Sequence, residues 1–255
     1  MNKSPNRFDL FLLSCFILFI TFQPYYLHGE IIMMETGIHL PAINALFHGA
    51  VLYRDVFFLR GPLELYVPAF FMGLFGKNMA ILPTFYYAGT IATLLIFLWI
   101  AHNLYRTRLI LYLMIVVFVA RTFPRVSFNY WGGMRYALGA LALLCVLFFF
   151  QKEKRRWILG AGVVSALGFL TTIETGLASS TAIVAGLTFA GIFKIPLKTS
   201  LRQAFGIYVA GILLVVIPYL VYLFCTGSFI PYVESTWLVA AKRTKTLVDA
   251  HGNHP

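Results

Sequence analysis

The chain has 255 residues, of which 60% are hydrophobic and only 11% are charged, and its mean hydropathy is +0.82. A soluble domain carries about 25% charged residues, so this composition excludes an ordinary soluble domain and indicates an integral membrane protein. The net charge of +11 is divided among short basic clusters between apolar runs. Such clusters are typical of loops that flank membrane helices, which argues against a nucleic-acid-binding surface.

The apolar runs predict an all-α polytopic membrane helix bundle, with a single membrane domain over residues 1–255. A helix needs about 20 apolar residues to cross the hydrocarbon core, and several runs approach that length. The predicted spans are 8–26, 79–102, 107–121, 136–150, 157–172, 177–193 and 204–225. No small-residue cleavage site follows the first run, so we expect a retained span rather than a removed signal peptide.

The orientation follows from the basic residues of the short loops, because Lys and Arg concentrate in short cytoplasmic loops. Those on the predicted cytoplasmic side are Lys3, Arg7, Arg106, Arg108, Lys152, Lys154, Arg155, Arg156, Lys194, Lys198 and Arg202. This arrangement places the N-terminus in the cytoplasm and the tail 226–255 on the outer side.

One apolar segment does not fit the pattern of spans. Pro62–Gly76 would be about 22 Å long as a helix, and counting it as a span would move every later basic loop to the outer side. We therefore expect an interfacial or re-entrant helix at the membrane surface. The first outer loop then covers residues 27–78 and holds four acids, which makes it the expected place of function. These acids are Glu30, Glu35, Asp55 and Glu64.

A helix is also expected earlier in this loop, because Ile38, Ala42, Ala45 and Leu46 are spaced for one helical face. Pro41 fits the first turn of that helix, and Glu35 would then lie just before its start, near free backbone N–H groups. Gly49 is expected to end the helix in a left-handed conformation.

These residues carry a resemblance to a known class. The stretch from Gly49 to Asp55 reads G-x-x-x-Y-R-D, and "GPLELYVPAFFMGLFG" leads into the next span. This pattern resembles the GT-C class of membrane glycosyltransferases, which includes the protein O-mannosyltransferases and the lipopolysaccharide-core glycosyltransferases. The segments "GFLTTIETGLASSTAIVAG" and "GILLVVIPYLVYLFCTGSFIPY" are similar to later parts of the same class.

The resemblance implies an inverting transfer of a sugar from a polyprenyl-phosphate donor to a hydroxyl of a lipid, glycan or protein, at the outer face of the cell inner membrane. It assigns the general base to Glu35, for which Glu30 could substitute. From its own chemistry, Asp55 is expected to orient the acceptor, bind a divalent cation or pair with Arg54. Thr36 and Thr172 stand where members of the class often carry Glu and Lys. Members also continue into further spans, so the resemblance implies a chain shortened at its C-terminus.

Phosphate recognition is expected from basic residues on the outer side. The segment "RTFPRVSFNYWGGMR" supplies Arg121, Arg125 and Arg135, and the arginine fork can bind two phosphate oxygens. The alternatives are contacts with lipid head groups or with Glu174, which is costly beside a span unless it is paired or faces a wet cavity.

The remaining candidate is His39, one helical turn after Glu35, which is placed either to hydrogen-bond that carboxylate or to face solvent. No His/Cys cluster with metal-ligand spacing exists in the sequence. No cofactor is expected, although the carboxylates would also suit a divalent cation.

Two other classes of function stay open from the sequence. A transporter subunit would be expected to carry inverted repeats and polar residues within its spans. A non-catalytic protein that holds a lipid-linked sugar would share the site but not the reaction.

Overall fold

The computed structural model describes residues 5–22, 33–105, 107–122, 126–195 and 199–238, with the backbone alone at 33–36, 121–122, 126–132 and 237–238. Within these ranges the chain forms helices and no β-sheet, which confirms the all-α prediction. The helices are α1 (Arg7–Thr21), α2 (Met33–Phe47), α3 (Leu63–Phe75), α4 (Ile81–Leu104), α5 (Arg108–Thr122), α6 (Val126–Lys152), α7 (Arg155–Phe169), α8 (Ile173–Ile192), α9 (Leu201–Cys225) and α10 (Phe229–Val233), followed by a π-helical turn, η2 (Glu234–Leu238).

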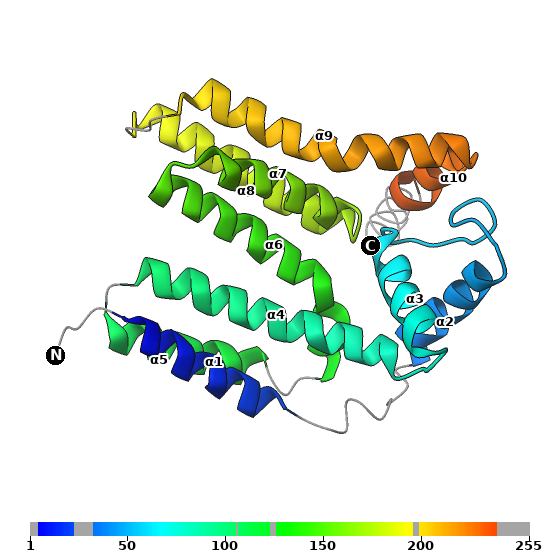
Figure 1. The fold of residues 1–255 in the computed structure, drawn as a ribbon, viewed down its shortest axis with the longest axis horizontal. Coiled ribbons are helices and arrows are strands. Elements are labelled where there is room, and N and C mark those ends of the chain that lie inside the picture. Colours follow the sequence, from blue (N-terminus) through cyan, green and yellow to red (C-terminus); the bar gives the residue numbers. More distant parts are fainter. Residues whose placement is uncertain (1–4, 23–32, 106, 123–125, 196–198, 239–255) are drawn as a thin grey trace, which may run out of the picture.

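The long helices form a bundle in which α4 packs on α6, α6 on α7 and α8, and α7 on α9 (Figure 1). Helices α1 and α5 pack beside α4. At one end of the bundle α4 and α8 begin while α7 and α9 end, and α2, α3 and α10 gather there (Figure 1). We call this the loop end, and the opposite end carries the short basic connections.

In the described part of the chain, four helical segments are long and apolar enough to cross a membrane: Ile81–Leu104, Gly133–Lys152, Ile173–Ile192 and Leu201–Cys225. The helices α1, α5 and α7 lie at the other predicted spans but have only 15 residues each, less than the about 20 residues that a span needs. A polytopic helical membrane protein is therefore supported, whereas the number of seven spans stays a prediction.

Small residues bring the bundle helices close together. A Cβ added at Gly162 of α7 would lie 2.1 Å from the carbonyl oxygen of Tyr208 in α9, and one added at Gly211 would lie 2.4 Å from that of Leu159. Membrane helices associate through such close backbone approaches, since lipid leaves little hydrophobic drive between them. The α7–α9 contact therefore depends on both glycines.

The first loop contains both expected helices, with one correction. Pro41 lies inside α2 rather than in its first turn, because α2 begins at Met33, and Glu35 is consequently its third residue. The predicted end is confirmed: Gly49 has a φ of 87°, and the N–H of Ala50 donates to the carbonyl of Ala45. Helix α3 matches the predicted Pro62–Gly76 segment, and with 13 residues it is too short to span.

Candidate functional site

The segment between α2 and α3 docks on the α7–α8 turn through its backbone. The N–H groups of Gly61 and Leu63 donate to the carbonyls of Thr171 and Leu170, each at 2.9 Å. A Cβ at Gly61 would lie 2.1 Å from the Leu170 carbonyl oxygen, so only glycine permits this approach. This contact places the start of α3 over the loop end of the bundle.

Before that docking point the chain makes a tight turn that presents Arg54 and Asp55. Tyr53 has a φ of 69°, and its N–H donates to the carbonyl of Val56 at 2.9 Å. The N–H of Val51 donates to Oδ2 of Asp55 at 2.8 Å. The hydroxyl of Tyr53 donates to the carbonyl of Arg60 at 2.6 Å, which ties the turn to the α3 start.

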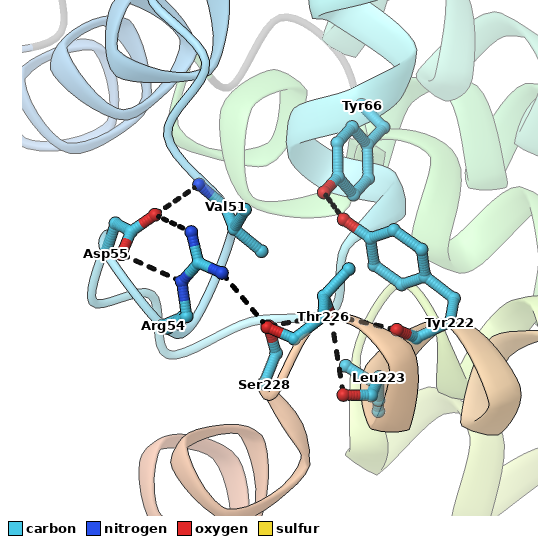
Figure 2. A network of polar contacts seen from close by, with 8 residues as sticks. All are labelled: Val51, Arg54, Asp55, Tyr66, Tyr222, Leu223, Thr226 and Ser228. Carbon is cyan, nitrogen blue, oxygen red and sulfur yellow. Dashed lines mark hydrogen bonds and ion pairs between the residues drawn. The ribbon is translucent and has the colours of Figure 1, made fainter.

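Arg54 and Asp55 form a two-pronged ion pair at this turn (Figure 2). Nε and Nη2 of Arg54 donate to Oδ1 and Oδ2 of Asp55 at 3.0 and 2.9 Å, and Nη1 reaches the carbonyl of Thr226 beyond α9 at 3.2 Å. The hydrogen bonds from Arg54 and Val51 hold the pKa of Asp55 below its usual range. Asp55 is therefore an ionised, exposed carboxylate at neutral pH.

A tyrosine pair continues this network toward α3. The hydroxyls of Tyr66 and Tyr222 are 2.9 Å apart, and the Thr226 hydroxyl donates to the carbonyl of Tyr222 at 2.8 Å (Figure 2). The Arg54–Asp55 turn, α3 and the end of α9 are thus linked by polar contacts.

A second, buried set of ionisable groups lies at the start of α3. We call it the Glu64 cluster, and its members are Glu64, His39, Arg60, Arg135 and Tyr86. Oε2 of Glu64 is 3.0 Å from Nη1 of Arg60 and 3.7 Å from Nε2 of His39, while Oε1 is 3.8 Å from Nε of Arg135. The Glu64 side chain is only 3% exposed. The cluster joins α2, α3, α4 and α6, since Tyr86 hydrogen-bonds Nε2 of His39 at 2.8 Å.

The cluster keeps Glu64 ionised. Burial alone would raise the pKa of Glu64, but the contact with His39 and the positive charges of Arg60 and Arg135 outweigh burial and lower it. A buried charge is tolerated where it is paired in this way. The role of Glu64 is therefore to hold the side chains of Arg60 and Arg135 in place rather than to accept a proton.

Arg135 retains binding capacity beyond its contact with Glu64. Its side chain is 15% exposed, and its Nη2 is buried with no hydrogen-bond partner among the residues that the structure describes. A buried donor left unsatisfied costs about 1–3 kcal/mol, so this guanidinium would gain from an anionic ligand. Its guanidinium carbon lies 5.9 Å from the ring centre of Tyr136.

Tyr136 in turn lines an apolar cleft of about 480 Å³ between α4, α5, α6 and α8, which we call the α6 cleft. Among its lining residues are Thr93, Phe97, Phe118, Tyr136, Leu143 and Glu174. Glu174 is exposed in the first turn of α8 and is the one carboxylate among the described residues of this lining. This lining suits an apolar ligand, and Glu174 places a carboxylate at the α8 wall of the cleft.

The structure divides the residues predicted from the sequence into separate groups. It brings His39 and Arg135 together through Glu64, holds Arg54 and Asp55 in their own pair, and puts Glu174 at the α6 cleft. The possibility that His39 faces solvent is wrong, because its side chain is only 1% exposed.

Three predicted residues cannot be placed in this geometry. Glu35 lies in α2 and Arg121 in α5, but their side chains are outside the described part, and Arg125 is outside it altogether. Among the described side chains, no group of three His, Cys, Asp or Glu could hold a metal ion.

The sequence interpretation missed the central role of Glu64 and its partner Arg60. A signal was available, since Arg60 and Glu64 are four residues apart at a helix start, which is the spacing of a helical ion pair. Tyr86 carried no comparable signal, because it lies within the apolar run of α4.

Comparison with known proteins adds nothing to this geometry: no protein-family model, no curated protein and no solved structure matches the chain.

Proposed function

We propose that the protein is a membrane glycosyltransferase similar to the GT-C class, which moves a sugar from a polyprenyl-phosphate donor to an acceptor hydroxyl with inversion. The single observation that carries this proposal is the Arg135 guanidinium, whose buried Nη2 has no hydrogen-bond partner in the described part of the chain and which lies beside a tyrosine of the apolar α6 cleft. An apolar chain in the cleft would place its phosphate near Arg135. Glu64 would hold that arginine in place.

The reaction requires a carboxylate and a cation on opposite sides of the anomeric carbon. The carboxylate, Glu35 or Asp55, takes the proton of the acceptor hydroxyl as its oxygen attacks the anomeric carbon. The bond to the phosphate oxygen breaks on the other side, and the phosphate leaves with the electron pair. Arg135 meets the negative charge that grows on it.

The orientation of the site is part of the same proposal. We infer that the loop end faces the outer side of the cell inner membrane, with the N-terminus in the cytoplasm and the C-terminus outside. The support is the charge distribution, since Lys152, Lys154, Arg155 and Arg156 lie in one short connection at the opposite end.

The test is transfer by purified protein in lipid nanodiscs, incubated with a panel of labelled polyprenyl-phosphate sugars. We expect Glu35→Gln or Asp55→Asn to lower the rate by about 10²–10⁴-fold, the contribution of a general base. Arg135→Lys keeps the positive charge but loses the two-pronged guanidinium. We expect it to lower the transfer rate about 10²-fold, at the lower end of the effect of removing one hydrogen-bond donor that stabilises the transition state. The matched control is Arg156→Lys at the exposed opposite end, which should leave transfer unchanged.

The outcomes separate the classes of function. Binding without turnover by the unmodified protein would favour a non-catalytic carrier of a lipid-linked sugar. No binding of any donor would favour a transporter subunit and reject the proposal. Equal transfer by the Arg135→Lys and Arg156→Lys variants would remove Arg135 from the site.

A further inference from the structure

A second apolar groove lies between α2 and α3, outside both the Glu64 cluster and the α6 cleft. We call it the α2–α3 groove, and its volume is about 610 Å³. Leu46 and Phe47 of α2 form one wall, and Tyr66, Phe70 and Leu74 are among the residues of α3 that form the other. From Tyr66 to Leu74 the helix rises about 12 Å, which is the length of wall that the groove offers to an extended chain.

The surface around this groove is apolar. Phe70, Leu74 and Phe75 are 62%, 60% and 74% exposed along α3. Contiguous apolar patches of this kind mark sites of contact with a membrane, a ligand or a partner. Helix α3 is followed by α4, which is long enough to cross a membrane, so we expect the groove at the membrane surface.

A positive charge stands at the far end of the groove. Helix α3 ends at Gly76 with a φ of 88°, and the chain turns so that Nζ of Lys77 lies 4.9 Å above the ring of Phe47. Lys77 is exposed, and no acidic residue is among the described residues that line the groove. Glu64 lies in the first turn of α3, at the opposite end of that helix from Lys77.

We propose that the α2–α3 groove binds one acyl chain of an anionic phospholipid, with the lipid phosphate held by Lys77. The apolar walls take the chain, and an ammonium at the membrane surface attracts an anionic head group. This site is separate from the proposed donor site and does not depend on sugar transfer. It would seat α2 and α3 against the membrane and so steady the Glu64 cluster, to which both helices contribute.

The test uses the purified protein in phosphatidylcholine nanodiscs that contain a phosphatidylglycerol with a photoactivatable group on its acyl chain. The groove is filled by Gly73→Leu, because a Cβ at Gly73 would lie 3.8 Å from the Phe47 ring and meets no backbone. The matched control is Gly186→Leu on α8, where a Cβ would have nothing within 4 Å. A third variant, Lys77→Gln, changes an exposed side chain alone.

We expect cross-links to concentrate in peptides of α2 and α3, and to fall at least fivefold in Gly73→Leu but not in Gly186→Leu. Lys77→Gln should remove the preference for phosphatidylglycerol over a phosphatidylcholine probe with the same reactive chain. Cross-linking spread evenly over the exposed helices and insensitive to Gly73→Leu would overturn the site. Covalent dimers of the chain through α3 would also overturn it, because the occupant would then be a second copy. Unchanged lipid preference in Lys77→Gln would refute the role of Lys77 even if Gly73→Leu fails to insert.

Discussion

Replacing Glu64 by glutamine tests whether the buried cluster holds the first loop on the bundle. Glu64→Gln keeps the size of the side chain and removes the only negative charge within the Glu64 cluster as defined above. The side chains of Arg60 and Arg135 are 23% and 15% exposed, so both positive charges would stay largely buried. Removing one partner from a buried ion pair costs about 3–5 kcal/mol. Because both arginines keep some contact with solvent, we expect a loss of about 3 kcal/mol in the free energy of unfolding.

The assay is equilibrium unfolding of the purified protein in mixed micelles. The matched control is Glu234→Gln, since Glu234 is exposed, and it should change the free energy of unfolding by less than about 0.5 kcal/mol. The double variant Glu64→Gln with Arg135→Gln should lose less than the sum of the single variants, with a coupling of about 0.5–3 kcal/mol. If Glu64→Gln lowers the free energy of unfolding no more than the control does, the contacts of Glu64 do not stabilise the fold.

Three further predictions concern pH, backbone packing and orientation. Folding lowers the pKa of Glu64 from its ordinary value of 4.5. The ionised carboxylate should therefore contribute its full stabilisation above about pH 5 and lose it as the pH falls through the folded pKa. A difference in unfolding free energy between wild type and Glu64→Gln that stays constant down to pH 2 would contradict this. Gly61→Ala should cost about 1–3 kcal/mol of unfolding free energy, since its Cβ would lie 2.1 Å from a backbone oxygen, whereas Gly206→Ala, with nothing within 4 Å, should cost nothing measurable. In a background without the natural cysteines, an impermeant thiol reagent added to spheroplasts should label a cysteine at Phe57 but not one at Lys154, and the reverse pattern would invert the proposed orientation.

Many features of this protein could be predicted from local sequence. The apolar run from Leu63 to Phe75 was too short to span and formed the expected short helix. Gly49 ended its helix in the left-handed conformation because that conformation is a property of glycine itself. The start of α2 was predicted too late, because a proline at position 41 suggested a first turn, whereas the structure accommodates it within the helix.

The site was harder to predict, because its residues are assembled by packing. Arg135 was chosen as a phosphate ligand from its place among outer arginines, and among the described residues its buried Nη2 has no hydrogen-bond partner. Its partner Glu64 was only counted among the loop acids. Nothing in the spacing of His39, Glu64 and Arg135 along the chain indicates that they meet.

The sequence alone indicated a helical membrane protein with four of its nine acids between residues 27 and 78, because hydrophobic run length and loop charge act locally along the chain. Only the tertiary structure decided which charges are buried together. Helices α2, α3 and α6 bring His39, Glu64 and Arg135 into one cluster, while Asp55 stays exposed beside Arg54. The physical reason is that the ionic partners of a buried group are set by which helix faces pack against one another, and close backbone contacts such as that at Gly61 select those faces.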